Sequence, residues 1–528
     1  MKFRFWFAAA LVFCAANLAS FAAAAPDASK RIAPSQIKQF PAAFERTPEA
    51  MDAFAATLAA PAAKGIPFNR PTIDMATYTA LKQQAAANAM AAVINRGSSS
   101  APLPPNSPII GSKFAGPKQC DTGSGCWFPP DSNGSIGKSQ FVSVDNDIFA
   151  VYSKAGGLLK EVSLNAFFGY STQPMFDPRV EYDENWGRWI VTAPAFPESS
   201  TVQILGVAIS QTTSATGKFW VYHLNVGGFG GANGFYDFPM LGISQDAVLF
   251  TANVFTATGF NGSSLFAVAK TRLYNGQGFS VPVFQGLVAT MQPSHQLGFD
   301  GNGYAWLAAA PSNNSNVYMV AMGYPASPQD TQLFGYYVVP VGAYQVPAGA
   351  VQLSCGGGAN ALDTGDNRFV NAGYQDGDRL YQAHSVFSLA TGRYYVIQGL
   401  NSFSPSILQE SSFFGTANSS DFNVSIAVDS SNRMVLNWTS SSPTAYFAQE
   451  RFAGRLDSDP AIGGVAGTVL LQSPTCLTGN FDSNFGEQRW GDYSKASVDP
   501  VTAKTFWIIN ETIPSTSFWG TEIGKIHF

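Results

Sequence analysis

Five aspartates lie just ahead of strand-like stretches in the chain after residue 108: Asp177, Asp237, Asp366, Asp421 and Asp492. Carboxylates that converge in a folded protein can bind a cation, and a pair held at a set distance can perform glycosidic acid–base chemistry. Each aspartate can instead accept hydrogen bonds from the backbone of a tight turn. We favour this structural interpretation, because residues that serve the geometry of a repeat recur in every repeat.

Two arginines and two aromatic residues accompany these aspartates. Arg179 and Arg368 each follow an aspartate by two residues, and Trp490 and Tyr493 flank Asp492. An arginine fork suits carboxylate or sulfate recognition, although a salt bridge to the neighbouring aspartate is the interpretation we favour. The aromatic pair suits either a sugar-stacking platform or the core. If a ligand binds here, we expect Arg179, Arg368 and Tyr493 to contact it.

The sequence contains few features that would indicate a cofactor. Repulsion among five converging carboxylates would raise some of their pKa values or recruit a cation such as Ca²⁺. The sequence has no Cys-x-x-Cys pair, its four histidines are scattered, and it lacks the serine-elbow, zinc-helix and phosphate-loop motifs. Ca²⁺ is therefore the one candidate cofactor.

Repeated strand–turn–strand units must position these residues. An alternating strand, a turn and a second apolar strand recur around Asp145, Asp183, Ser244, Asp300, Asp376, Asp429 and Asp499. Seven such units predict an all-β, seven-bladed β-propeller, although the unequal intervals also fit six or eight blades. If each unit supplies the inner strands of a blade, the five aspartates ring one mouth of the central channel.

One stretch resembles the sialidase-like propellers. "FDPRVEYDENWGRWIVTAP" and the following "VQILGVAISQTTSATGKFWVYHL" look like a blade of that superfamily. Ser210, Gly217 and Trp220 stand where its Ser-x-Asp-x-Gly-x-Thr-Trp box would lie. "RWGDYSKASVDP" is similar to segments of secreted bacterial propellers. The resemblance implies a propeller over residues 109–528 and no particular activity. We expect "EIGKIHF" to close the ring by pairing near "IIGSKF".

The N-terminal part is organised differently. Residues 1–25 read as a signal peptide, with Lys2 and Arg4 before an apolar run and small residues at Ala23 and Ala25. Residues 26–96 are Ala-rich and are expected to be helical, with Asp74 as a candidate N-cap. Residues 97–108 form a Ser/Pro linker. We therefore expect an exported protein, extracellular or periplasmic, without a transmembrane segment.

The four cysteines after the signal peptide suit disulfides in an oxidising compartment: Cys120, Cys126, Cys355 and Cys476. Cys120 and Cys126 enclose a short loop that a disulfide between them can close. By elimination Cys355 would then pair with Cys476, although four cysteines allow three connectivities. The net charge is −5 with no basic block, which argues against a nucleic acid partner.

Two classes of function follow from the channel mouth. The first is a monomeric module that binds an extracellular polymer, a glycan above all, or a partner protein. The second is a glycan-cleaving enzyme, either a glycoside hydrolase or a polysaccharide lyase, with its site at the same mouth. We favour binding, because no catalytic constellation is legible in the sequence.

Overall fold

The computed structural model describes ten ranges of the chain: 25–58, 70–96, 101–123, 126–195, 198–199, 201–229, 234–298, 303–355, 360–482 and 486–528. Nearly all of the expected signal peptide, the turn at Asp300 and the start of the Ser/Pro linker lie outside these ranges. Within them, none of the helices has the length and apolarity needed to span a membrane.

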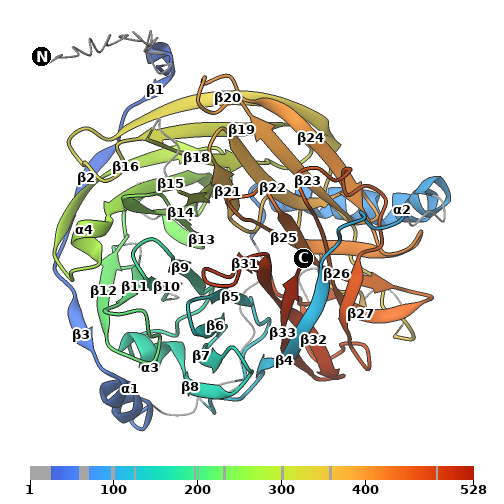
Figure 1. Cartoon of the computed structure of the whole chain (residues 1–528), viewed down its shortest axis with the longest axis horizontal. Helices are drawn as coiled ribbons and strands as arrows, with labels where there is room; N and C mark the ends of the chain where they lie inside the picture. Colours follow the sequence, from blue (N-terminus) through green and yellow to red (C-terminus); the bar gives the residue numbers. More distant parts are fainter. Residues whose placement is uncertain are drawn as a thin grey trace, which may run out of the picture.

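The chain is mostly β, and its sheets surround a common centre in a propeller-like arrangement (Figure 1). In the described ranges the strands form seven four-stranded antiparallel units. The first three units contain β5 (Asn133–Ile136), β6 (Gln140–Asp145), β7 (Ile148–Ser153) and β8 (Leu158–Val162); β9 (Arg179–Asp183), β10 (Arg188–Pro194), β11 (Ile204–Ser210) and β12 (Phe219–Asn225); and β13 (Phe235–Ile243), β14 (Ala247–Thr256), β15 (Gly259–Ala269) and β16 (Phe279–Leu287).

The remaining units follow in chain order. Units four to six contain β17 (Gln292–Leu297), β18 (Tyr304–Ala309), β19 (Asn314–Gly323) and β20 (Gln332–Tyr344); β21 (Gly373–Asp376), β22 (Arg379–Val386), β23 (Thr391–Gln398) and β24 (Ser406–Phe413); and β25 (Ser420–Val428), β26 (Met434–Ser442), β27 (Tyr446–Arg455) and β28 (Thr468–Gln472). Unit seven contains β31 (Lys495–Val498), β32 (Thr505–Ser515), β33 (Phe518–His527) and β4 (Ile109–Lys118). Short elements in the connections are α3 (Leu164–Phe168), α4 (Lys270–Leu273), β29 (Phe481–Asp482) and β30 (Glu487–Gln488).

Strand β4 closes the ring as expected. It pairs antiparallel with β33, with Phe114 opposite Ile523 and Ile109 opposite His527. The first and last strands of the ring thus complete one sheet, in which β4 covers the edge of β33 and forms the outer strand.

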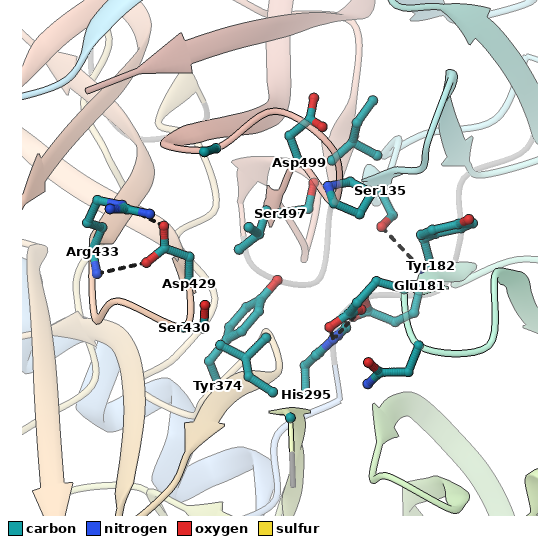
Figure 2. Close-up of a pocket in the computed structure, with 18 of the residues that line it drawn as sticks. Ser135, Glu181, Tyr182, His295, Tyr374, Asp429, Ser430, Arg433, Ser497 and Asp499 are labelled. Carbon is teal, nitrogen blue, oxygen red and sulfur yellow. Dashed lines mark hydrogen bonds and ion pairs between the residues drawn. The ribbon is translucent and has the colours of Figure 1, made fainter.

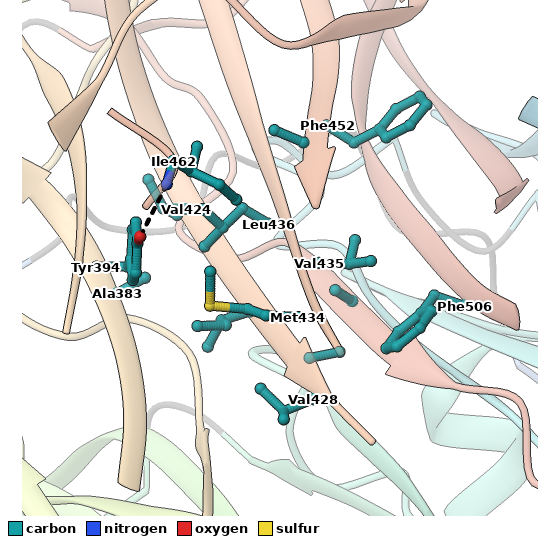
Figure 3. Packing of buried hydrophobic residues seen from close by; sticks show 14 of the residues in the cluster. Ala383, Tyr394, Val424, Val428, Met434, Val435, Leu436, Phe452, Ile462 and Phe506 are labelled. Carbon is teal, nitrogen blue, oxygen red and sulfur yellow. Dashed lines mark hydrogen bonds between the residues drawn. The ribbon is translucent and has the colours of Figure 1, made fainter. Parts of the chain in front are cut away.

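Apolar side chains between neighbouring units form the core (Figure 3). Val424 and Leu436 of the sixth unit are fully buried with Tyr394 of the fifth and Phe506 of the seventh. The Tyr394 hydroxyl accepts a hydrogen bond from the Ile462 N–H at 3.0 Å. Burying each large apolar side chain contributes about 1.5–3 kcal/mol, so packing between units holds the ring together.

The N-terminal region departs from the helical expectation. Its helices are α1 (Pro48–Ala55) and α2 (Met75–Arg96), and the expected Asp74 cap accepts a hydrogen bond from the Thr77 N–H. Three short strands, β1 (Arg31–Ile32), β2 (Gln36–Phe40) and β3 (Phe44–Arg46), follow the 3₁₀ turn η1 (Ala28–Lys30). They pair with β20, β16 and β12 along the rim (Figure 1), because the outer edges of those units offer unpaired backbone groups.

The first unit also differs from its expected alignment. Asp145 lies in the turn between the second and third strands, whereas Asp183 ends the inner strand of its unit. The true inner strand is β5, "NGSI", which is too short and polar to show an alternating pattern. This one-strand offset shortens the first interval between turns, which stays the shortest when it is measured from the β5–β6 turn.

Both disulfides connect as expected. Cys120 is bonded to Cys126, and Cys355 to Cys476 across 121 residues of sequence. The second bond joins the connection that precedes the fifth unit to the one that precedes the seventh. In the chain-entropy model, closing so long a loop contributes about 4 kcal/mol.

Candidate functional site

The inner strands of the units line a central channel with two chemically different ends. At one end these strands begin, and acids and arginines gather there; we call this end the acidic mouth. At the other end the inner strands turn back, and a cavity opens there; we call this end the pocket mouth. The expected site residues belong to the acidic mouth.

The structure brings most of the expected residues together at the acidic mouth. The Tyr493 hydroxyl lies 3.2 Å from Asp177 Oδ2, and the Arg179 guanidinium lies 3.3 Å from the centre of the Tyr493 ring. Burial raises the pKa of Asp177 well above its usual range, and the nearby charges of Asp131, Asp237 and Asp492 raise it further. Asp366 and Arg368 also belong to this cluster, where they form a salt bridge with each other.

The two arginines have different partners. Arg368 Nη2 lies 2.6 Å from Asp366 Oδ2, so the expected salt bridge with the neighbouring aspartate is present. Arg179 instead donates to the carbonyl oxygens of Pro239 at 3.0 Å and Val370 at 3.2 Å. Arg179 therefore ties the second unit to strand β13 of the third unit and to the connection before the fifth, and its donors point at backbone.

Asp421 lies apart from this cluster. Its fully buried carboxylate accepts hydrogen bonds from the Gly415 N–H at 2.9 Å and from Trp438 Nε1 at 3.0 Å. The Ser419 hydroxyl donates to it at 2.6 Å. Asp421 thus holds the loop before β25, which matches the turn-bonding interpretation at this position.

Asp131 is a member of the acidic mouth that the sequence pattern missed. Burial raises the pKa of both Asp131 and Asp177, and the nearby charge of Asp131 raises the pKa of Asp177 further. Both residues lie two positions before an inner strand, and both have left-handed backbones, with φ of 47° and 48°. The misaligned first unit concealed Asp131, and the shared offset from β5 and β9 would have revealed it.

A second missed residue, Arg489, is the main cation of this mouth. It is 1% exposed, and its Nη1 lies 2.8 Å from Asp363 and 3.4 Å from Asp492. Burial raises the pKa of Asp492 to about 7 even though Arg489 opposes that rise. One guanidinium therefore serves several carboxylates, and they are not all ionised at neutral pH.

Residues 70–96 cover part of the acidic mouth. Arg368 Nη2 donates to the Arg70 carbonyl oxygen at 2.9 Å, and the Tyr78 hydroxyl donates to the Gly365 carbonyl oxygen at 3.2 Å. Lys82 in α2 lies 3.7 Å from Asp363 and 3.9 Å from Glu487. The sequence pattern of this helix did not predict that it would cover a mouth of the channel.

The pocket mouth holds a cavity of about 390 Å³ (Figure 2). Inner strands or their turns from six of the seven units contribute to its wall, which shows that it lies on the channel axis. Its principal polar and aromatic lining residues are Ser135, Glu181, Tyr182, Glu184, Asn185, His295, Tyr374, Asp429, Arg433, Ser497 and Asp499.

A buried ionic network forms the floor of this pocket. His295 lies between two carboxylates, with Nδ1 3.4 Å from Glu181 and Nε2 3.2 Å from Glu184, and its ring stacks on Tyr374. Burial alone would lower the pKa of His295, but the two carboxylates raise it to about 10. Lys495 and His295 overcome the effect of burial on Glu181 and lower its pKa to about 2. The network is therefore fully ionised at neutral pH.

The other carboxylates of the pocket are also individually paired. Asp429 bonds to Arg433 Nε at 2.6 Å, and Asp499 bonds to Lys154 Nζ at 2.8 Å. Each carboxylate among the described lining residues thus contacts a cation, and these residues present fixed hydrogen-bond acceptors with little net charge. In the described ranges, no group of His, Cys, Asp and Glu residues is arranged to hold a metal ion.

No family model and no curated protein matches the chain. Solved structures overlap it weakly. A *Trypanosoma rangeli* sialidase mutant displaying trans-sialidase activity is 10% identical over 81% of this chain and 60% of its own, with a TM-score of 0.34. The exo-β-1,3-galactanase of *Phanerochaete chrysosporium* with galactose is 10% identical over 65% and 80%, with a TM-score of 0.30. A *Dyadobacter fermentans* protein of unknown function is 8% identical over 80% and 100%, with a TM-score of 0.38.

Overlaps of this size leave the chemistry of the site to be judged from the residues of this chain.

Proposed function

We propose that the protein is an exported, monomeric, seven-bladed β-propeller that binds a neutral glycan in the pocket mouth. The seven four-stranded units support the blade count, and the two disulfides support an oxidising compartment. The observation that carries the proposal is the pocket itself, where each carboxylate among the described lining residues is paired with a cation.

Such a pocket suits a ligand rich in hydroxyl groups and without charge. Ionised carboxylates are strong acceptors for hydroxyl donors, and here they are held in place by their cations. A charged ligand would have to compete with an existing ion pair at each of these carboxylates. The cavity volume of about 390 Å³ falls in the usual range for small-ligand sites, roughly 300–1,000 Å³.

The pocket also suits binding better than cleavage. Glycosidic cleavage requires one carboxyl group with a raised pKa to act as the acid. The pKa values of Glu181, Glu184 and Asp499 are lowered instead, because cations and hydrogen bonds favour their ionised forms.

A glycan array with neutral and acidic members tests the proposal, followed by titration calorimetry on the best neutral ligand. Glu184→Gln is the informative variant, because Glu184 is 30% exposed and lines the pocket. Losing a hydrogen bond to a charged group should weaken binding about 10- to 100-fold. Glu45→Gln, which removes an exposed carboxylate paired with Lys218 outside the pocket, is the matched control. Exclusive binding of acidic glycans would contradict the proposal.

Glycan cleavage at the acidic mouth is a second candidate, and one observation favours it. Burial and neighbouring carboxylates raise the pKa of Asp177 well above its usual range, and Asp177 lies beside Tyr493 and Arg179, which favours a carboxylic acid next to other carboxylates. Release of reducing ends from the bound glycan, abolished by Asp177→Asn with pocket binding retained, would establish this function. No release by the wild-type protein from any glycan that it binds would eliminate it.

A further inference from the structure

Trp186 is unlike the other described tryptophans. It is 41% exposed, and within the described ranges no other tryptophan is among the exposed large apolar residues. It lies in the hairpin between β9 and β10, directly after Glu184 and Asn185, which line the pocket. Neighbouring Cα atoms are about 3.8 Å apart, so the indole begins at the pocket rim.

The exposed indole is nevertheless fixed in orientation. Its Nε1–H donates to the Gln245 carbonyl oxygen at 3.3 Å, and its ring meets the Tyr274 ring edge-on at 5.6 Å between centroids. Tyr274 is itself anchored, because its hydroxyl donates to Asp183 at 2.6 Å. A hydrophobic surface held this way can accept a ligand with little further loss of conformational entropy.

The anchoring group below Trp186 is rigid as well. Asp183 Oδ2 lies 2.6 Å from the fully buried Lys270 ammonium, and Asp183 Oδ1 accepts hydrogen bonds from the backbone N–H groups of Asn185 and Trp186. The hairpin therefore presents the indole from a preformed turn, and neither the second nor the third unit needs to move for it to be used.

Among its described lining residues, the pocket has no open aromatic face. The Tyr374 ring is stacked against His295 at 5.1 Å with an interplanar angle of 17°. The Tyr182 ring packs on Trp189 at 4.7 Å, and Tyr182 is only 3% exposed. Sugars present both hydroxyl groups and apolar C–H faces. A site that offers only hydrogen-bond acceptors binds the hydroxyl groups and leaves the C–H faces without a contact. Trp186 supplies the missing aromatic surface outside the pocket.

We propose that Trp186 is an outer stacking subsite, so that the ligand is a neutral oligosaccharide whose end occupies the pocket and whose next units lie on the indole. This inference rests on the proposed binding function and adds to it the length of the ligand and the direction in which it leaves the pocket, toward the third unit, which contributes Gln245 and Tyr274.

The experiment uses the full exported chain and a panel of neutral β-linked gluco- and galacto-oligosaccharides of increasing length from the monosaccharide. For the wild type, we expect affinity to rise when a second or third sugar unit is added. Trp186→Ala should remove that rise, a loss of about three- to tenfold for the longer ligands, and leave monosaccharide affinity unchanged. Trp186→Phe should retain most of the rise, because it keeps an aromatic face.

Three comparisons separate the possible failures. Phe518→Ala removes another exposed aromatic, 46% exposed on β33, and should leave the length dependence intact. Melting temperatures of all variants report whether the fold is retained. A length dependence that survives in folded Trp186→Ala overturns the subsite but leaves pocket binding standing. Binding that Glu184→Gln leaves unchanged overturns the pocket instead, and no binding by any panel member overturns both.

Discussion

The two ends of the channel use the same residue types in opposite ways. At the pocket mouth each carboxylate has a cation of its own, and the pKa of Glu181 falls to about 2. At the acidic mouth several carboxylates share Arg489, and the pKa of Asp492 rises to about 7. Counting acids would rank the acidic mouth as the stronger site. The pairing of charges shows instead that the carboxylates of the pocket mouth stay ionised and act as fixed hydrogen-bond acceptors. At the acidic mouth, burial raises the pKa of carboxyl groups such as that of Asp492.

The same contrast separates stability from binding. Buried carboxylates that share a cation make the fold sensitive to pH, because their protonation differs between the folded and unfolded chain. Individually paired carboxylates keep their charge over a wide range. The acidic mouth is therefore expected to govern stability, and the pocket mouth to act at nearly constant charge.

The largest expected effect comes from removing the shared cation. Arg489→Ala leaves Asp363 and Asp492 buried without their guanidinium, which should cost about 3–5 kcal/mol of unfolding free energy at pH 7. Denaturant unfolding measures this loss. At pH 5 the loss of unfolding free energy should be smaller, because carboxyl groups that have lost the guanidinium can be protonated. Arg379→Ala, which breaks an exposed pair with Asp457, is the control and should cost under about 1 kcal/mol. An equal cost for both variants would remove the contrast between the two ends.

Asp145 offers a smaller and cleaner test of pH dependence near the acidic mouth. Burial raises its pKa to about 7, above its value in the unfolded chain. Its favourable contribution is therefore complete below about pH 4 and is lost as pH rises to about 7, a change on the order of 2–4 kcal/mol. Asp145→Asn should flatten that part of the stability curve and make the protein more stable than the wild type at pH 8. Parallel curves for variant and wild type would contradict the assignment.

The smallest expected effect is at the pocket mouth. Because the pKa of Glu181 is about 2 and that of His295 about 10, neither charge changes between pH 5 and 8. Glycan affinity measured by calorimetry should vary less than about twofold over that interval. A steep change centred near pH 6.5 would mean that His295 titrates normally and that its two carboxylate contacts are not formed.

Local patterns in the sequence predicted much of the architecture. Alternating strands, the pairing of the last strand near residues 109–114, and the disulfides all depend on features that lie within short segments. The gathering of Asp177, Asp237 and Asp492 was predictable because the repeat places equivalent residues at one end of the ring. Whether these residues bind a ligand stays a prediction.

The rest depended on contacts between distant segments. Strands β1 to β3 are too short to show a pattern, and only the free edges of β20, β16 and β12 give them a partner. The pocket network joins β9, β17 and β31, whose charged residues look like ordinary surface positions when read one strand at a time. The covering of the acidic mouth by α2 is likewise set by tertiary contacts.

The rim strands and the closing strand also impose an order on folding. Residues near the start of the ring bond to residues near its end, as in the hydrogen bond from Thr521 Oγ1 to the Pro117 carbonyl oxygen across 404 positions. Chains dominated by such non-local pairings fold slowly. Strand β4 is synthesised early but cannot pair until β33 has been synthesised. Strands β1 to β3 likewise cannot pair until units two to four have been synthesised. The edges that are covered in the finished ring are therefore open while the chain is still incomplete, which makes this the interval in which the protein most needs protection from aggregation.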